Sequence, residues 1–150
     1  MRLSTRGRYA VMAMVELAAR QPPDGLEDSR ARVSLAEIAQ AQHLSLAYLE
    51  QLFGPLRRAG LVASARGPGG GYRLARAASA TSIAEIVLAV DEPLRATRCG
   101  DKSPGCMMNG ERCLTHDLWE ETGRQIEAWL ASVSLEDVVT GRVGPGRRAA

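Results

Sequence analysis

The sequence has few aromatic residues and no long apolar run. Aromatic residues make up 4% of its 150 residues, with a single phenylalanine, so Leu, Val, Ile, Met and Ala must build the core, which favours helices. No apolar run approaches the roughly eighteen residues that span a bilayer. The first residues also lack the apolar stretch of a secretory signal. We therefore expect a cytoplasmic protein that makes no membrane contact.

The sequence also lacks the motifs of common enzyme classes. It contains no Walker loop, no nucleotide-binding glycine fingerprint, no C-x-x-C pair and no Ser-His-Asp arrangement set by motif. A mass of 16.1 kDa, with 45% hydrophobic and 24% charged residues, matches one globular domain, with or without a dimerising extension. We therefore expect a binding protein and not an enzyme.

The net charge of +2 hides an asymmetry between the two halves of the chain. Residues 1–76 hold eleven arginines against six acidic residues, whereas residues 77–150 hold eight basic residues against eleven acidic ones. The first half is therefore the better match for a polyanion such as DNA.

The first half predicts a helix, a loop and then two short helices joined by a turn. Residues 5–19 form an amphipathic pattern that Ser4 caps, and residues 21–33 hold turn residues and charges without a period. Ser34 and Glu37 form a capping box for a helix over 35–42. A second helix, capped by Ser45, has apolar residues at intervals of three and four until Gly60.

Residues 35–59 therefore match a helix-turn-helix, although any two helices of an α-domain can be joined in this way. Residues 61–66 alternate like a strand, five residues rich in glycine follow, and 72–74 can return as a second strand. A helix-turn-helix followed by such a hairpin is a winged helix, with Arg66 near the tip of the wing. The alternative is a surface hairpin whose glycines only permit the turn. We expect a mainly α fold with a small β hairpin, with residues 1–76 as the DNA-binding part and a wing over 61–74.

The second half predicts a short helix, an irregular loop and a long helix. Ser82 and Glu85 form a second capping box for a helix that ends at Val90, and residues 91–113 are irregular. Residues 114–133 read as one helix, followed by a short helix over 134–141. The long helix has an apolar stripe at Leu118, Thr122, Ile126, Trp129 and Val133, with Trp119 and Leu130 beside it. No later segment is long enough to cover this stripe, so we expect a symmetric homodimer; folding back on the first helix is the alternative.

The loop and the start of the long helix place three cysteines and a histidine in the pattern Cys99-x6-Cys106-x6-Cys113-x2-His116. Three thiolates and an imidazole suit tetrahedral zinc or a 2Fe-2S cluster, and the wide gaps fit a structural zinc site poorly. Cys113 and His116 stand three residues apart at the expected helix start, so their side chains should point the same way. Three thiols on a loop without any metal are the remaining alternative.

Several segments together resemble the Rrf2 family of winged-helix regulators, in particular its members that sense iron-sulfur clusters. These are the first eleven residues, Ser45 to Phe53, Gly60 to Val62, Arg66 to Tyr72, and Cys113-Leu-Thr-His116. The resemblance extends to about residue 140. It implies a homodimer on a palindromic DNA operator, which controls cluster-assembly genes and receives its cluster from assembly proteins. The implied ligands of the 2Fe-2S cluster are Cys99, Cys106, Cys113 and His116.

The resemblance also implies which residues contact double-stranded DNA. Glu50 and Gln51 would read bases and Arg66 would enter the minor groove, in keeping with the hydrogen-bonding capacity of these side chains. The full set of expected DNA contacts is Arg2, Arg8, Tyr48, Glu50, Gln51, Arg57, Arg66, Gly69, Gly70 and Tyr72.

The sequence departs from the family pattern at several positions. Ala47 replaces a hydroxyl residue, and each gap between the cysteines is one residue longer than usual. Pro55 cannot donate a hydrogen bond to the carbonyl of Gln51, so we expect it to interrupt the second helix of the helix-turn-helix. An alternative function is a winged-helix regulator whose cysteines sense oxidation, nitric oxide or zinc.

Overall fold

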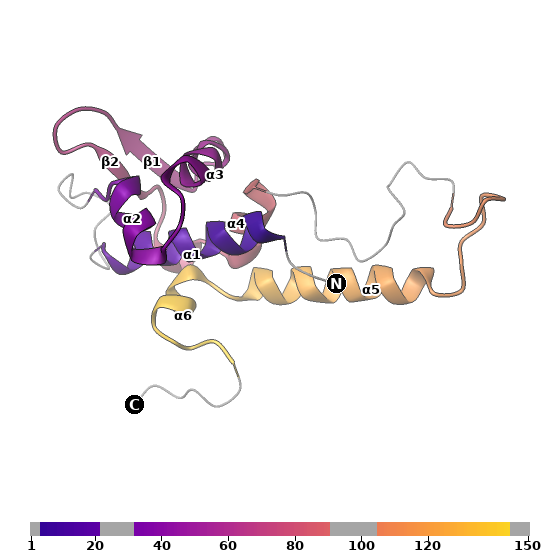
Figure 1. Cartoon of the computed structure of the whole chain (residues 1–150). Coiled ribbons are helices and arrows are strands. Elements are labelled where there is room, and N and C mark those ends of the chain that lie inside the picture. Colours follow the sequence, from indigo (N-terminus) through magenta and orange to yellow (C-terminus); the bar gives the residue numbers. More distant parts are fainter. Residues whose placement is uncertain (1–3, 22–31, 91–104, 145–150) are drawn as a thin grey trace.

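The structure, a computed structural model, describes residues 4–21, 32–90 and 105–144. Helices, a two-stranded hairpin and a short 3₁₀ helix follow one another in chain order: α1 (Thr5–Ala19), α2 (Leu35–Gln42), α3 (Leu46–Arg58), β1 (Val62–Ala65), β2 (Gly71–Leu74), η1 (Ala78–Ala80), α4 (Ile83–Val90), α5 (His116–Ser132) and α6 (Leu135–Val139). All elements except α5 gather at one end of the molecule, and α5 extends away from them (Figure 1). The expected fold, mainly helical with a small hairpin, is confirmed.

Side-chain caps define where the first three helices begin. The Ser4 hydroxyl accepts a hydrogen bond from the backbone amide of Gly7, and Ser34 and Glu37 form the predicted capping box at α2. His43 ends α2 in a left-handed conformation, with φ of 52°. The chain then turns, and Ser45 caps α3. The predicted helix-turn-helix is therefore present, with bounds within a residue of those expected.

Helix α3 continues through Pro55 to Arg58, so the predicted interruption is wrong. The proline removes one backbone donor, but the apolar residues on both sides of it lie in the core. Leu52, Phe53 and Leu56 are fully buried. Their packing holds the two parts of α3 together as one element, because several buried side chains outweigh one missing hydrogen bond.

The hairpin pairs β1 and β2 antiparallel, with Val62 opposite Leu74 and Ala65 opposite Gly71. A further bridge joins Val33 to Tyr72, with N–O distances of 2.9 and 2.8 Å in the two directions. Residue 33 belonged to the predicted loop, and its part in this bridge was not predicted. Gly71 allows the close approach, because a Cβ atom there would lie 2.7 Å from the Val33 carbonyl oxygen. This contact fixes the base of the wing against the segment that leads into α2.

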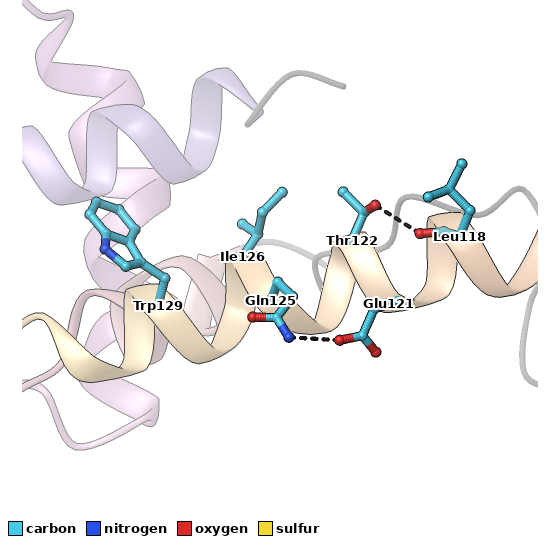
Figure 2. A pocket seen from close by; sticks show the side chains of 6 residues that line it. All are labelled: Leu118, Glu121, Thr122, Gln125, Ile126 and Trp129. Carbon is cyan, nitrogen blue, oxygen red and sulfur yellow. Dashed lines mark hydrogen bonds between the residues drawn. The ribbon is translucent and has the colours of Figure 1, made fainter.

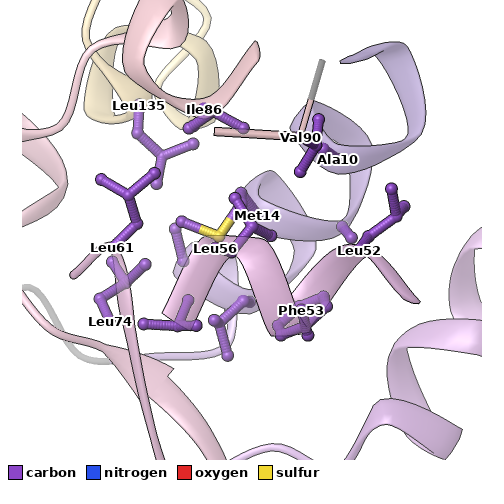
Figure 3. Close-up of a cluster of buried hydrophobic side chains, with 14 of the residues drawn as sticks. Ala10, Met14, Leu52, Phe53, Leu56, Leu61, Leu74, Ile86, Val90 and Leu135 are labelled. Atoms are coloured by element: carbon purple, nitrogen blue, oxygen red, sulfur yellow. The ribbon is translucent and has the colours of Figure 1, made fainter. Parts of the chain in front are cut away.

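The core lies between α1, α3, α4 and the hairpin (Figure 3). It is built almost wholly from aliphatic side chains, as the composition predicts, with Phe53 as its one phenylalanine. Leu135 of α6 is fully buried in the same cluster. The core members labelled in the figure are Ala10, Met14, Leu52, Phe53, Leu56, Leu61, Leu74, Ile86, Val90 and Leu135.

Helix α5 begins at His116 and ends at Ser132, so it is shorter at both ends than the predicted 114–133. At 1.5 Å per residue its 17 residues extend about 25 Å. Its C-terminal end is attached to the core by paired backbone bonds: Ile83 donates to Val133 at 2.9 Å, and Leu135 donates to Thr81 at 2.8 Å. None of the helices in the described parts of the chain is both long and apolar enough to cross a membrane.

Candidate functional site

The outer face of α3 carries the polar side chains that were predicted to read bases. Glu50 and Gln51 are exposed, and so are Ala47 one turn earlier and Arg57 near the end of the helix. The Arg57 guanidinium donates to the Ser64 hydroxyl on β1 at 3.3 Å, which links this helix to the wing. A helix with an apolar inner face and exposed hydrogen-bonding groups on its outer face can enter the major groove of DNA.

The two tyrosines among the expected DNA contacts have aromatic partners inside the protein. Tyr48 packs edge-on against Tyr9 of α1, with ring centroids 5.8 Å apart, and Tyr72 packs against Phe53 at 4.7 Å. Both tyrosines are partly buried. These ring contacts were not predicted, because they join side chains far apart in the sequence. They orient α3 and the wing, and DNA contact by either tyrosine stays a prediction.

The wing presents Arg66 as an exposed residue beside the turn. Gly67 and Gly69 have φ angles of 90° and 72°, which favour glycine, and a Cβ atom on Gly70 would lie 2.5 Å from the Ala65 carbonyl oxygen. The turn itself therefore requires glycine at these positions. Their expected role in contacting DNA stays a prediction, as does that of the exposed Arg8 on α1. Arg2 lies outside the described residues.

A second group of functional side chains gathers at the start of α5. The Cys106 Sγ atom lies 2.9 Å from Nδ1 of His116, and His116 is only 8% exposed. Residues 106–111 form a compact turn that places Cys106, in which Cys106 donates its backbone N–H to the Glu111 carbonyl at 3.0 Å. The His116 amide donates to the Cys113 carbonyl at 3.0 Å, which brings Cys113 to the same end of the helix.

The environment of Cys113 favours its thiolate. A hydrogen bond with the Thr115 hydroxyl and a second one with Cys106 lower the pKa of the Cys113 thiol. Cys106 and Cys113 are thiols and are not joined in a disulfide. The structure therefore brings together three of the four predicted ligands, Cys106, Cys113 and His116; Cys99 lies outside the described residues. Thiolates and an imidazole in this arrangement can bind a soft or borderline metal centre.

Two acidic residues lie beside the histidine. The carboxylates of Asp117 and Glu120 and the His116 ring have ligand atoms within 4.8 Å of one another. Sequence reasoning missed these residues. A usable signal was present, since Glu120 follows His116 by four residues and must share its helix face.

The apolar stripe of α5 is exposed at Leu118 and Trp129 and partly buried at Thr122, Ile126 and Val133. Leu118, Ile126 and Trp129 line a shallow groove with Thr122, and Glu121 and Gln125 form its polar flank (Figure 2). Leu118 is 59% exposed and Trp129 is 55% exposed. Val133, the last residue of the predicted stripe, and Leu130 beside the stripe pack against the core.

Comparison with known proteins finds transcriptional regulators. Residues 3–141 match the Rrf2 family model, described as an iron-dependent transcriptional regulator. The chain is 50% identical over 139 residues to the HTH-type transcriptional regulator IscR of Xenorhabdus nematophila, covering 93% of this chain and 79% of the relative. It is 51% identical over 140 residues to a putative HTH-type transcriptional regulator of Azotobacter vinelandii, with the same coverage of both chains.

Solved structures give the same result. The chain matches CymR, the global cysteine regulator of B. subtilis, with a TM-score of 0.73 and 32% identity, covering 96% of this chain and 99% of CymR. It matches T. potens IscR with a TM-score of 0.70 and 32% identity, covering 100% of this chain and 93% of that one. These similar proteins are regulators, in agreement with the expectation that the chain is not an enzyme.

Proposed function

Because the chain belongs to the Rrf2 family of winged-helix transcriptional regulators, we propose that it senses the supply of iron-sulfur clusters through a bound 2Fe-2S cluster and controls cluster-assembly genes. The observation that carries this proposal is the meeting of Cys106, Cys113 and His116 at the start of α5. Relatives named IscR and the family description as iron-dependent support it.

The donor chemistry fits such a cluster. Two thiols, one of them with a lowered pKa, and a nearly buried imidazole form a ligand set that holds iron well. Cys99 is the fourth proposed ligand. When bound, the cluster supplies a redox-active and removable centre whose presence reports on iron and sulfide supply. Proteins that assemble clusters are its proposed donors.

DNA recognition is assigned to α3 and the wing, within residues 1–76. Gln51 can pair with adenine by donating from its side-chain NH2 group and accepting with its side-chain oxygen, Glu50 can accept from the amino group of cytosine, and Arg66 suits a narrow minor groove. Arg57 and the exposed basic residues of the first half contribute contacts to the phosphates. The remaining proposed contacts are Arg2, Arg8, Tyr48, Gly69, Gly70 and Tyr72.

A homodimer paired through α5 would present two copies of α3 to a palindromic operator. The exposed groove of Leu118, Ile126 and Trp129 is the surface proposed for this pairing, because large apolar side chains at such a seam gain most from burial. A twofold axis in the protein then matches the twofold axis of the operator. As a regulator of transcription, the dimer would act in the cytoplasm.

The fold offers a physical connection between the two sites. Helix α5 begins at His116, directly after the segment that holds the thiols, and backbone bonds attach its other end to residues 81–83, at the start of α4. Glu85 of α4 pairs with Arg76, two residues beyond β2, at 2.8 Å. A change at the thiol end of α5 can therefore reach the wing through packed and hydrogen-bonded elements.

A second candidate is a regulator whose cysteines respond to oxidation, nitric oxide or zinc. The lowered pKa of the Cys113 thiol beside Cys106 favours it, since the thiolate is the reactive form. A similar solved structure is an oxidised form of CymR from Staphylococcus aureus, with 30% identity and a TM-score of 0.70.

Anaerobic purification followed by assays of iron and acid-labile sulfide tests the proposal. We expect both elements and visible absorption in the natural protein, and loss of the absorption in Cys106→Ala with the dimer retained. Zinc without sulfide would support the second candidate. DNA sequences that the purified protein selects from random duplexes then test whether the cluster changes DNA binding. Arg66→Ala should weaken binding to these sequences by about 1–3 kcal/mol. Equal binding of every selected duplex by the holo and apo forms would contradict cluster sensing.

A further inference from the structure

The two ring nitrogens of His116 face chemically different partners. Nδ1 lies 2.9 Å from the Cys106 sulfur, whereas Nε2 lies 3.7 Å from an oxygen of the Glu120 carboxylate. The histidine is 8% exposed, so few other groups can approach the ring. Glu120 lies one helical turn after His116, at the spacing that brings side chains onto the same helix face.

A metal-binding histidine uses one nitrogen as the ligand and carries its proton on the other. The proton must be on the nitrogen that points away from the metal, and an acceptor at that nitrogen selects this tautomer. In this chain the thiols lie on the Nδ1 side and a carboxylate lies on the Nε2 side. The carboxylate favours a proton on Nε2, and in that tautomer Nδ1 accepts from the Cys106 S–H across the 2.9 Å contact. In the other tautomer Nδ1–H would donate to the sulfur.

We propose that Glu120 is a positioning residue for His116, which it holds in the Nε2–H tautomer so that Nδ1 can bind the metal centre. The proposal rests on the proposed function for the identity of that centre. The 3.7 Å separation exceeds a hydrogen bond, and the Glu120 side chain is 50% exposed, so a change of rotamer can bring the carboxylate to bonding distance. The expected contribution is accordingly at the lower end of what such outer partners provide.

Neighbouring acidic residues are placed less well for this role. The Asp117 side chain is 87% exposed and its carboxylate pairs with Arg112 at 3.7 Å. Glu121 accepts a hydrogen bond from Gln125 at 2.6 Å, on the flank of the apolar groove. Asp117→Asn therefore separates the effect of Glu120 from that of any nearby charge. Glu127→Gln is a matched control on the same helix, at a residue that does not line the groove.

The tautomer can be measured in the protein without any metal. The chain has two histidines, so ¹⁵N-histidine NMR gives two ring systems, and His43 in the turn between α2 and α3 serves as an internal reference. In the neutral imidazole ring of His116 we expect the proton on Nε2. Glu120→Ala should move the population toward Nδ1–H, and Glu120→Gln should retain much of the natural pattern, because its amide oxygen can still accept.

Cluster retention provides the second measurement. In anaerobically loaded protein, transfer of iron to a chelator should be about tenfold faster in Glu120→Ala than in the natural chain. The rate should fall in the order Glu120→Ala, Glu120→Gln, natural protein, and Glu127→Gln should match the natural protein. Helical circular dichroism and thermal melting of the apo proteins report whether each variant is folded.

Two outcomes would overturn the proposal: an unchanged His116 tautomer in folded Glu120→Ala, or the same tautomer shift in Asp117→Asn. Failure of the proposed function is distinguishable from both. A natural protein that never holds iron and sulfide would refute cluster sensing, while the apo NMR measurement would still decide whether Glu120 sets the tautomer.

Discussion

Helices α3 and α5 carry the same kind of apolar stripe and use it in opposite ways. In α3 the stripe is fully buried from Leu49 to Leu56, whereas Trp129 of α5 keeps 55% of its surface exposed. Helix α3 contacts α1, α2, α4 and β1, while α5 contacts α4 and otherwise extends away from the packed elements (Figure 1). Intervals of three and four residues therefore define an apolar face without defining what covers it. One helix finds its cover within the chain, and the other has its apolar groove available for a partner.

The largest expected effect comes from the buried stripe. Phe53→Ala removes the one aromatic ring of the core and its contact with Tyr72, so we expect a loss of about 3–5 kcal/mol in the free energy of unfolding. Urea denaturation followed by circular dichroism measures it. Arg58→Ala, at an exposed position of the same helix, is the control. A loss below about 1 kcal/mol would mean that α3 is not the centre of the core.

The exposed stripe should affect association and leave the fold intact. Trp129→Asp places a charge in the proposed dimer seam, and we expect the dimer to weaken by about 2–4 kcal/mol, or roughly 30- to 1000-fold in Kd. Sedimentation equilibrium gives this value, and circular dichroism checks the helical content. Ala128→Asp adds the same charge next to the groove residues without lining the groove, and should change association less. Equal dimerisation of all three proteins would place the interface elsewhere.

The smallest expected effect is on the free energy of unfolding and comes from Glu85 of α4, which pairs with Arg76 near the end of the wing. Glu85 accepts hydrogen bonds from the Ser82 amide at 2.9 Å and from Arg76 at 2.8 Å, and these interactions lower the pKa of its carboxyl. Because the folded state has the lower pKa, the stabilisation is complete above the unfolded-state pKa and is lost as the pH falls through the folded-state pKa. Glutamine keeps an acceptor for the Ser82 amide but loses the half-exposed ion pair with Arg76, so Glu85→Gln should cost about 0.2–1 kcal/mol at neutral pH.

The pH dependence gives the sharper measurement for Glu85. Unfolding free energies of the natural protein and the variant should converge as the pH falls, because protonated Glu85 makes neither charged interaction. Glu37→Gln at the corresponding capping box of α2 provides a comparison site, where the Ser34 hydrogen bonds lower the carboxyl pKa most and Arg20 contributes least. A constant difference between the two curves at all pH values would rule out an ionised Glu85 as the source of the stabilisation.

Local features were predictable from the sequence, and contacts between distant segments were not. Ser34 with Glu37, Ser82 with Glu85 and the glycines of the wing act on backbone groups a few residues away, so their patterns predict helix starts and a turn directly. The Val33–Tyr72 bridge depends instead on two segments almost forty residues apart. No local signal marks it.

Pro55 and the thiol site also show that local sequence signals do not predict how distant segments pack. The local preference of proline predicts an interruption that the buried residues around it prevent. The spacing of the cysteines and His116 predicts a shared site, but the partner of each imidazole nitrogen follows only from how α5 meets the 106–111 turn. The approach of Cys106 to Nδ1 and of Glu120 to Nε2 is a property of the folded chain.

The sequence by itself determined the helix starts, the hairpin turn, the amphipathic faces and the set of candidate metal ligands, because caps, glycine conformations and periodicity act over a few residues. Only the tertiary structure decided that α3 runs unbroken through Pro55, that Val33 joins the wing, that the stripe of α5 stays partly exposed and that His116 lies between a thiol and a carboxylate. These outcomes depend on which surfaces meet when the chain closes, and the packing energy of many distant side chains then exceeds the preference of any single residue.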